Sequence, residues 1–377
     1  MIIYKGLFFL VSGTSAYVIL LLSLRLMASK NEDRTDKKEE DYDWKTKEEL
    51  EIVDIISETH DIKSFYFKRK NKKSFYTFSP GQFLSFQIKD DHKLLRSYSI
   101  SGSCENTSTL QVSIKKLNDG QGSQWFHQLN IGDSVWAFPP GGLFTDDNLD
   151  LNSPRVYIGG GIGITPLISM IKTNIDRSCK APMSLFYGMR STKDLAFHKE
   201  LVLLSERHSQ FSYFPLLSDI DDNWEGQKGY ITYDFIKSKV EIKANHNFYF
   251  CGPPVLTDSV SEKIVASGHD ANLIHSEKFA SPVAFDPANI SNRKAEITVD
   301  GQSFTYEGKS SILEFLEDNH VNIDFACRSG VCGACKCKLL KGDVDAFTDS
   351  GLTASEIKDG YFLSCVSRPT SDLEIKI

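Results

Sequence analysis

The sequence predicts a multidomain protein in which one transmembrane helix precedes an antiparallel β-barrel, an α/β domain with a parallel sheet, and a small third domain with a metal site. Three observations support this order. The 377 residues exceed the length of one typical domain. Hydrophobic residues change along the chain from short alternating runs to repeated strand, turn and helix patterns. Five of the eight cysteines lie beyond residue 326, which is typical of a metal site.

The first predicted element is an uncharged run at Gly6–Leu24, which is long enough for one membrane span. Polar residues near its middle leave a signal peptide or a helix buried in protein as alternatives. Basic residues are more frequent after the run than before it, so a span would leave the rest of the chain in the cytoplasm. Residues 1–29 are therefore predicted to be a single-pass membrane anchor.

Residues 30–49 are predicted to be a solvated tether, because they carry many charges of both signs and almost no apolar side chains. Over the whole chain, 43 basic and 50 acidic residues give a formal net charge of −7. The chain has no basic block interleaved with aromatic residues. This composition argues against a nucleic-acid partner.

Residues 50–150 are predicted to form the antiparallel barrel, because short alternating runs such as Leu50–Ser57 and Leu110–Lys115 are separated by turn residues. Residues 151–280 alternate strands with helices, which predicts a parallel sheet. Residues 281–294 have the Pro, Asn and Ser content of a linker. Residues 295–377 are the third domain.

The third domain contains the most specific signal. Cys327, Cys332 and Cys335 have the spacing C-x4-C-x2-C, and Cys365 follows 30 residues later. This is the plant-type spacing of a [2Fe-2S] cluster. A zinc site is the alternative, but zinc sites usually contain two C-x2-C pairs and this segment contains one. Cys337 is surplus; it is expected to pack as a small buried residue, with an alternative-ligand role left open.

Two further motifs predict nucleotide sites. The glycine-rich Gly159–Pro166 follows a strand and opens a helix, where backbone N–H groups favour a pyrophosphate. Pro166 replaces the third glycine of the usual fingerprint, so a structural turn is the alternative. In the first domain, Arg96 can bind a phosphate bidentately, and Tyr98 faces the same side of the strand, where it can stack on a flavin. An ordinary strand is the alternative there.

The order of these motifs resembles the ferredoxin–NADP reductase superfamily, in the subgroup with a C-terminal plant-type ferredoxin domain. The resemblance covers residues 50–377. It implies an FAD-binding barrel, an NAD(P)-binding α/β domain, and a β-grasp ferredoxin domain whose [2Fe-2S] cluster is bound by Cys327, Cys332, Cys335 and Cys365. Pro140–Phe144 resembles the P-x-G-x-F segment of members that bind FAD rather than FMN.

The resemblance also implies roles for residues of the barrel. Arg96, Ser97, Tyr98 and Ser99 would bind the flavin: Arg96 at a phosphate, Tyr98 on the ring, and the catalytic Ser99 near N5. Gly122 and Ser123, at a predicted helix start, would meet the FAD pyrophosphate.

In the α/β domain, the resemblance implies that Gly161, Gly163, Thr165 and Pro166 bind the dinucleotide. Two further pairs complete the implied site: Cys251 with Gly252 beside the nicotinamide, and Glu277 with Phe279 near the flavin. Of these, Cys251 and Glu277 would be catalytic. Arg190, followed by Ser191, could bind a 2′-phosphate, but NADH and NADPH both stay open as donors.

These implications predict an NAD(P)H:acceptor oxidoreductase, since a flavin can take two electrons as hydride and release them singly to an iron–sulfur cluster. The expected acceptor is a membrane-associated oxygenase, hydroxylase or fatty-acyl desaturase. One alternative is a soluble acceptor such as a hybrid-cluster protein. A second is a membrane-tethered redox sensor without enzymatic activity, in which Cys337 would matter.

Overall fold

The computed structural model describes residue 44 and residues 46–377, apart from residues 72, 76–77, 90, 92, 148–149, 220–223, 280–293 and 309. The predicted membrane anchor at residues 1–29 lies outside the described residues, as do most of the predicted tether and linker. Within the described part of the chain, no helix is long and apolar enough to cross a membrane. The three domains that follow belong to the unit Thr46–Ile377.

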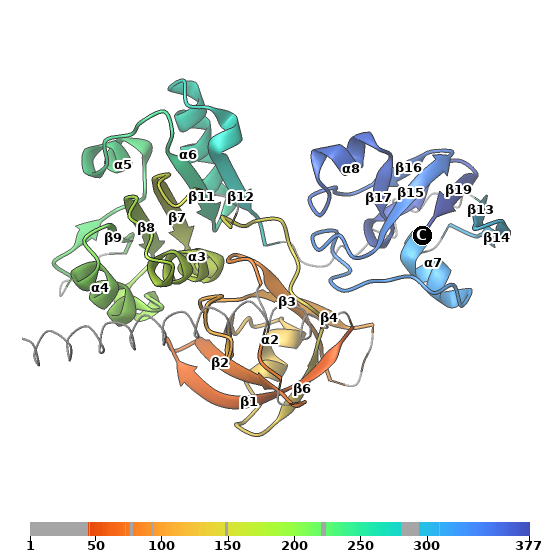
Figure 1. The fold of residues 1–377 in the computed structure, drawn as a ribbon, viewed down its shortest axis with the longest axis horizontal. Helices are drawn as coiled ribbons and strands as arrows, with labels where there is room; N and C mark the ends of the chain where they lie inside the picture. Colours follow the sequence, from red (N-terminus) through yellow and green to blue (C-terminus); the bar gives the residue numbers. More distant parts are fainter. Residues whose placement is uncertain are drawn as a thin grey trace, which may run out of the picture. The chain divides into compact units, whose positions relative to one another are not determined.

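The first domain is an antiparallel barrel, as predicted (Figure 1). The strands bond in the order β4-β3-β6-β1-β2-β5, and every pairing is antiparallel. A bridge between Ile100 and Val112 joins the two edges and closes the barrel. The strands are β1 (Glu48–Ser57), β2 (Ile62–Arg69), β3 (Phe83–Gln87), β4 (Leu95–Ser99), β5 (Leu110–Lys115) and β6 (Ser134–Ala137).

The barrel core is aromatic and is completed by the short helix α2 (Gln121–Phe126). Phe65 and Phe86 alternate with polar positions on their strands and are fully buried. The ring of Phe126 lies 5.5 Å from that of Phe65 and 5.0 Å from that of Phe86, edge to face. These contacts fix α2 against the strands, which matters below because α2 begins beside the predicted flavin residues.

The start of β1 corrects one predicted boundary. Glu48 and Glu49 were assigned to the tether by their charge, but they belong to β1. The guanidinium of Arg69, almost fully buried on β2, donates to the Glu48 carboxylate, with Nε to Oε2 at 2.8 Å. Glu49 pairs with Lys70 at 2.8 Å. Cross-strand cations thus stabilise carboxylates that composition alone assigns to solvent.

The second domain is an α/β domain with a parallel sheet, again as predicted. The strand order is β10-β9-β8-β7-β11-β12, and every pairing is parallel. The strands are β7 (Arg155–Gly160), β8 (Met183–Met189), β9 (Phe211–Leu217), β10 (Gln227–Lys228), β11 (Asn247–Cys251) and β12 (Ile274–Glu277). The helices are α3 (Ile164–Asp176), α4 (His198–Arg207), α5 (Tyr233–Lys239) and α6 (Pro254–Ala266), with 3₁₀ turns η1 (Gly161–Gly163), η2 (Thr192–Asp194) and η3 (Ala271–Leu273).

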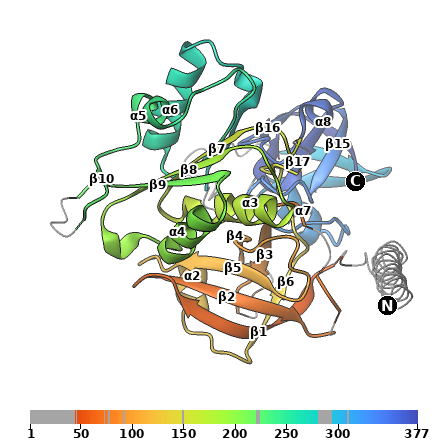
Figure 2. The ribbon, with the colours of Figure 1, turned by 60° about the vertical axis from the view of Figure 1, so that its left-hand side comes forward.

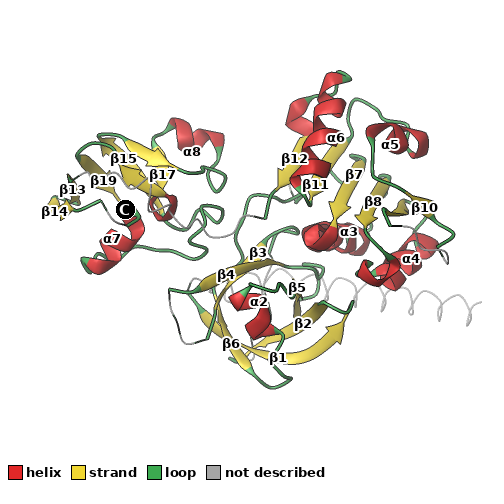
Figure 3. Cartoon of the chain, turned by 180° about the vertical axis from the view of Figure 1, so that it is seen from behind, coloured by secondary structure: helices red, strands yellow, loops and turns green. Residues whose placement is uncertain are grey.

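Helices cover both faces of this sheet (Figures 2 and 3). Successive residues of β7 enter different cores: Tyr157 packs with α3 and α4, whereas Val156 and Ile158 pack with α5 and α6. The strand order reverses between β7 and β11, so the carboxyl ends of these two strands form the switch point where open α/β sheets bind ligands.

One helix of this domain does not follow its turn directly. After β8 the chain first forms η2, and α4 begins only at His198. Phe197 has a φ of 58°, in the left-handed region, and separates α4 from η2. Because Ser191 and Asp194 cap η2 reciprocally, the chain turns there before the helix begins.

The third domain has a mixed five-stranded sheet in the order β14-β13-β19-β15-β17. The pairing of β13 with β19 is parallel and the others are antiparallel. The strands are β13 (Ala295–Val299), β14 (Gln302–Tyr306), β15 (Lys336–Lys341), β17 (Tyr361–Leu363) and β19 (Leu373–Lys376); β16 (Val344–Ala346) pairs with β18 (Ser367–Pro369). The helices are α7 (Ile312–Asp318) and α8 (Ala354–Lys358), and the 3₁₀ turn η5 (Ser364–Val366) precedes β18.

Candidate functional site

A cavity of about 680 Å³ brings together most of the predicted flavin residues. This volume is typical of a cofactor site. Residues from all three domains line it. The predicted lining residues are Arg96, Ser97, Tyr98, Ser99, Gly122, Ser123, Thr165, Phe279 and Cys327.

Gly122 at the start of α2 packs directly against two of these side chains. A Cβ built at Gly122 would lie 2.7 Å from Cγ of Arg96 and 2.8 Å from the hydroxyl of Tyr98. Only glycine lets α2 approach β4 this closely. The Tyr98 ring also packs edge to face on Phe126 at 5.4 Å, and burial raises the pKa of its phenol, so the hydroxyl stays protonated.

The serines of the cavity differ in what they can offer a ligand. The hydroxyl of Ser123 accepts from the amide of Leu117 at 3.1 Å and donates to the carbonyl of Gly120 at 3.0 Å. The hydroxyl of Ser97 bonds with that of Ser85 at 2.9 Å. Ser123 therefore uses its hydroxyl to close the loop before α2, which leaves its backbone N–H as the group that can face a phosphate.

The glycine-rich turn after β7 lies against the carboxyl end of β11. A Cβ at Gly163 would lie 2.1 Å from the carbonyl oxygen of Cys251, and a Cβ at Gly252 would lie 2.8 Å from the amide of Gly160. The hydroxyl of Tyr187 donates to the carbonyl of Gly161 at 3.0 Å. The predicted dinucleotide residues thus meet at the switch point of the sheet, where backbone can approach a pyrophosphate closely.

The helix that follows this turn accommodates the proline that departs from the usual fingerprint. Thr165 and Pro166 are buried in the first turn of α3, where an amide N–H has no intrahelical partner to lose. The hydroxyl of Thr165 donates to the carbonyl of Ile162 at 2.9 Å and closes the turn. Pro166 therefore preserves the helix start.

Cys251 and Glu277 lie side by side at the ends of β11 and β12, as a register pair of the parallel sheet. Burial raises the pKa of Glu277 to about 8. The residue is half-buried overall, but its Oε2 is enclosed and has no hydrogen-bond partner among the described residues. Burial, with a smaller effect of Glu277, raises the pKa of the Cys251 thiol well above its ordinary value. At neutral pH both groups are mainly protonated.

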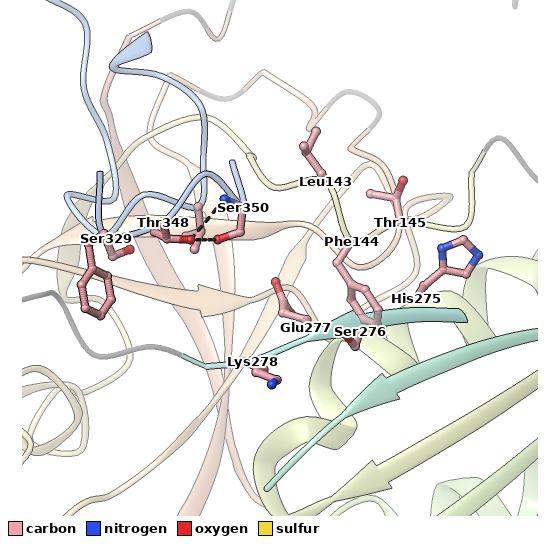
Figure 4. A pocket seen from close by; sticks show the side chains of 12 residues that line it. Leu143, Phe144, Thr145, His275, Ser276, Glu277, Lys278, Ser329, Thr348 and Ser350 are labelled. Carbon is pink, nitrogen blue, oxygen red and sulfur yellow. Dashed lines mark hydrogen bonds between the residues drawn. The ribbon is translucent and has the colours of Figure 1, made fainter. Parts of the chain in front are cut away.

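A second cavity, of about 490 Å³, lies beside Glu277 (Figure 4). The segment His275–Lys278 forms one part of its wall, together with Phe144 from the loop after the barrel. Thr348 and Ser350 of the third domain also line it, and their hydroxyls are 2.6 Å apart. The carboxyl of Glu277 is therefore next to a space that a ligand can enter.

The cysteine loop of the third domain is tightly wound. Gly330 and Gly333 have φ values of 76° and 74°. A Cβ at Gly330 would lie 2.6 Å from Cγ2 of Thr348, and one at Gly333 would lie 2.7 Å from the carbonyl oxygen of Gly351. Both positions require glycine, because the conformation is left-handed and the space is filled.

Backbone and side-chain contacts bring the fourth cysteine to this loop. The amide and the hydroxyl of Ser364 donate to the carbonyl of Cys335 at 3.1 and 2.9 Å, so Cys365 lies beside Cys335. Thiol hydrogen bonds join Cys327 to Cys332 and Cys365, and Cys335 to Cys365; they lower the pKa of the acceptors Cys327 and Cys335 and raise that of the donors Cys332 and Cys365. Thiolates are the form that binds iron.

The amides of the loop point at the sulfurs, as cluster hydrogen bonds require. The amide of Ser329 donates to Sγ of Cys327 at 3.4 Å, and that of Ala334 to Sγ of Cys332 at 3.5 Å. Among the described residues, no group of three His, Cys, Asp or Glu side chains surrounds one point closely enough for a single metal ion. Four thiols at this spacing are the donor set of a [2Fe-2S] cluster.

The other cysteines are buried. Cys337 is part of the domain core, and burial raises the pKa of its thiol to about 12. Its Sγ donates to the carbonyl of Cys335 at 3.8 Å, so it packs as a small core residue. Cys104 and Cys179 are also buried, and neither lines the two cavities.

Arg190 lies apart from both cavities, after β8. Its side chain is 83% exposed, and its Nε lies 3.7 Å from Oδ2 of Asp219. Phe279 is half-exposed at the edge of the larger cavity.

Sequence reasoning missed several residues of the cavities. Phe83, Ser113 and Lys115 line the larger cavity from β3 and β5, and Lys115 pairs with Asp61 at 3.2 Å. His275 lines the smaller one. The period of two along each strand could have predicted which residues share a face. It could not predict which strands close the barrel beside β4.

Three family models match successive parts of the chain. They describe an oxidoreductase FAD-binding domain at residues 49–145, an oxidoreductase NAD-binding domain at residues 157–262, and a 2Fe-2S iron-sulfur cluster binding domain at residues 297–370. The chain belongs to the FAD- and NAD-binding reductases with a C-terminal [2Fe-2S] ferredoxin domain. The resemblance found in the sequence is thereby confirmed.

Named relatives span nearly the same length as this reductase. The glycine betaine monooxygenase reductase subunit of Chromohalobacter salexigens is 29% identical over 350 residues, which are 87% of this chain and 94% of that protein. The ferredoxin reductase component of 3-ketosteroid-9-alpha-monooxygenase from Rhodococcus rhodochrous is 27% identical and covers 86% of this chain and 94% of its own. Phthalate dioxygenase reductase, a solved structure, has a TM-score of 0.58 and 26% identity, covering 87% of this chain and 97% of its own.

The reductase therefore uses FAD, a [2Fe-2S] cluster and NAD(P)H. When bound, these groups supply hydride transfer and single-electron transfer, which no protein side chain provides. The residues present fit them: Arg96, Tyr98 and Gly122 would hold the flavin, and four cysteine thiols would hold the cluster. The protein contributes binding and orientation, and it buries Cys251 completely.

Proposed function

We propose that this reductase is anchored in a membrane and carries electrons from NAD(P)H, through FAD and the [2Fe-2S] cluster, to a membrane-associated oxygenase, hydroxylase or fatty-acyl desaturase. One observation is the main support. Arg96 and Tyr98, the predicted flavin residues, line the same cavity as Cys327, a predicted cluster ligand. A flavin in that cavity would lie beside the cluster, so electrons would cross a short gap.

The acceptor class rests on the relatives and on the N-terminal sequence. The relatives are named as reductase components of two monooxygenases. The uncharged run Gly6–Leu24 supports a membrane location. An anchor would confine the reductase and a membrane partner to two dimensions and so raise their effective concentration.

The relay is tested by anaerobic titration of the cofactor-replete protein with NADH and separately with NADPH, while flavin and cluster absorbance are recorded together. Both chromophores should be reduced by at least one nucleotide, with the cluster following the flavin. A flavin that bleaches while the cluster stays oxidised would contradict the proposed relay.

The anchor is tested by deleting residues 1–29. The truncated protein should oxidise NAD(P)H with an artificial acceptor at the rate of the full chain, because it retains the unit Thr46–Ile377 that contains the three domains. In vesicles that contain the membrane acceptor, coupled turnover should fall. Equal coupling by both proteins would remove the proposed role of the anchor and favour a soluble acceptor.

A further inference from the structure

The end of β8 places an arginine and two carboxylates together. The amide of Asp219 donates to the carbonyl of Arg190 at 2.8 Å, which continues the pairing of β9 with β8 beyond the strands. This bond fixes Asp219 beside Arg190, and the Asp219 carboxylate lies 3.7 Å from the guanidinium Nε. The cation at this position thus already faces an anion of the same protein.

The next residue, Ser191, also donates its hydrogen bonds to a carboxylate. The hydroxyl of Ser191 donates to Oδ2 of Asp194 at 2.8 Å, and its amide donates to the same oxygen at 3.1 Å. These two donors close the capping box that begins η2. A phosphate at this position would therefore have to compete with Asp194 for both donors.

The position matters because of the sheet topology. β8 is the strand next to β7, whose glycine turn begins the dinucleotide site, and Arg190 follows the carboxyl end of β8. In dinucleotide folds, the carboxyl end of this second strand faces the adenosine ribose. A carboxylate there accepts hydrogen bonds from the 2′-hydroxyl of NADH, whereas a free arginine accommodates the 2′-phosphate of NADPH.

We propose that the reductase discriminates in favour of NADH through Asp194 and Asp219, which pair with Ser191 and Arg190 and would repel a 2′-phosphate. Lys193, in the same turn, and Asp219 are both exposed, so solvent screens their charges alike, and the discrimination also rests on Asp194, which occupies both donors of Ser191. The ribose diol of NADH brings no charge and suffers no repulsion. This inference deepens the proposed function, since it names the donor of the same relay.

The test compares the binding of NAD⁺ and NADP⁺ to the full-length, cofactor-replete protein by isothermal titration calorimetry, alongside kcat/KM with NADH and NADPH. We expect NAD⁺ to bind at least about tenfold more tightly. The preference should be seen mainly in KM, because the two donors carry the same nicotinamide. Equal or tighter binding of NADP⁺ would overturn the inference.

Two variants assign the preference to the carboxylates. Asp219→Asn should tighten NADP⁺ binding by about three- to fivefold and change NAD⁺ binding by less than about twofold, in keeping with the small energies of exposed charge pairs. Asp176→Asn is the matched control, because Asp176 is an exposed aspartate at the far end of α3. It should leave both dissociation constants unchanged.

A direct role of Arg190 in binding the 2′-phosphate predicts different affinities. If Arg190 bound the 2′-phosphate without hindrance from Asp219, NADP⁺ would bind the wild type at least as tightly as NAD⁺ and Asp219→Asn would leave its affinity unchanged, and that result would overturn the inference. Because binding is measured directly, a protein that binds NAD⁺ preferentially but reduces no acceptor would refute the proposed relay and still support the preference.

Discussion

Glu277 and Cys251 are two acidic groups that burial keeps protonated at neutral pH. The carboxyl of Glu277 has an Oε2 without a hydrogen-bond partner among the described residues, and its pKa is about 8. A protonated carboxyl can donate a hydrogen bond, which a carboxylate cannot. Glu277 is therefore suited to donate to a polar atom of a ligand in the adjoining cavity without adding a charge there.

The raised pKa makes a stability prediction for Glu277→Gln. Between the ordinary pKa of 4.5 and the folded pKa of about 8, the folded protein keeps a proton that the unfolded chain releases. The free energy of unfolding of the wild type should therefore fall as pH rises through this window. From pH 6 to pH 8 the loss from this group is roughly 2 kcal/mol.

Glutamine does not titrate, so the variant should lack this pH-dependent loss. Denaturant unfolding at pH 6 and pH 8 would measure the difference between the two proteins. Glu262→Gln, at an exposed glutamate of α6, is the control and should follow the wild type. Parallel pH curves for the wild type and Glu277→Gln would contradict the prediction.

A second prediction concerns the cluster ligands. Cys332→Ser should lower the rate of cytochrome c reduction by more than about 100-fold. Removal of a residue that only orients a metal ligand typically costs about 10- to 100-fold, and loss of the ligand itself should cost more. Ferricyanide reduction, which flavin can support directly, should persist. Cys337→Ala is the matched control, because Cys337 is a core residue with a protonated thiol. The Cys337→Ala variant should retain the cluster absorbance. Loss of ferricyanide reduction in Cys332→Ser would contradict the proposed order of electron transfer.

Single residues could be singled out from the sequence where a motif has fixed spacing. The four cysteines and the Arg96–Ser99 strand are of this kind. The partners of those residues could not be predicted, since they come from distant segments. Gly122 lies against Arg96 only because α2 folds back onto β4, and Asp219 lies beside Arg190 only because β9 pairs with β8.

At the level of elements, the turn between β7 and α3 contains two glycines that are required for different reasons. Gly163 has no room for a side chain, because a Cβ would lie 2.1 Å from the carbonyl of Cys251. Gly161 has nothing within 4 Å of a built Cβ, but its φ is 60°. One position is limited by space and the other by backbone conformation.

Alanine substitutions should separate these two causes. Gly163→Ala should destabilise the protein by about 3 kcal/mol or more and weaken NAD⁺ binding by at least about tenfold, because α3 must move away from β11. Gly161→Ala should cost only about 1–2 kcal/mol, the strain of a left-handed alanine. Thermal unfolding and calorimetric binding measure both effects. Equal destabilisation by the two variants would contradict this assignment.

The elements themselves were largely predictable. The run Leu110–Lys115 matches β5 residue for residue, because apolar strands bounded by turn residues leave a clear local pattern. The differences from the sequence-based expectation lie at the ends of the elements. β1 extends to Glu48 through a cross-strand ion pair, and α4 begins only at His198 because Phe197 is left-handed. Neither cause is visible in local hydrophobicity.

At the scale of the whole molecule, most of the net negative charge lies in the third domain. From Lys294 onward the chain has 14 acidic and 9 basic residues. This excess should steer the domain towards a basic acceptor. Reduction of cytochrome c, a basic protein, should slow several-fold as ionic strength rises from about 0.01 M to 0.15 M, where screening shortens to about 8 Å. Stopped-flow rates would test this, and a rate independent of salt would contradict it.

Domain order was predictable at this scale, because each domain has its own hydrophobic pattern or cysteine spacing. Contacts across the boundary of the first two domains were not. Asp146, after the barrel, pairs with the fully buried Arg155 of β7, and it also accepts from Tyr157 at 3.0 Å. Such a buried network depends on the completed fold, since each member is costly to bury alone.

The burial of Cys251 has a consequence for how long the enzyme survives. Oxidation of a cysteine by peroxide requires an accessible thiolate. Cys251 is 0% exposed, and burial holds its thiol in the unreactive protonated form. Peroxide formed by stray reaction of a reduced flavin with oxygen would therefore spare this residue. The close fit of Gly163 against the carbonyl of Cys251 thus helps to keep this thiol out of reach of oxidants.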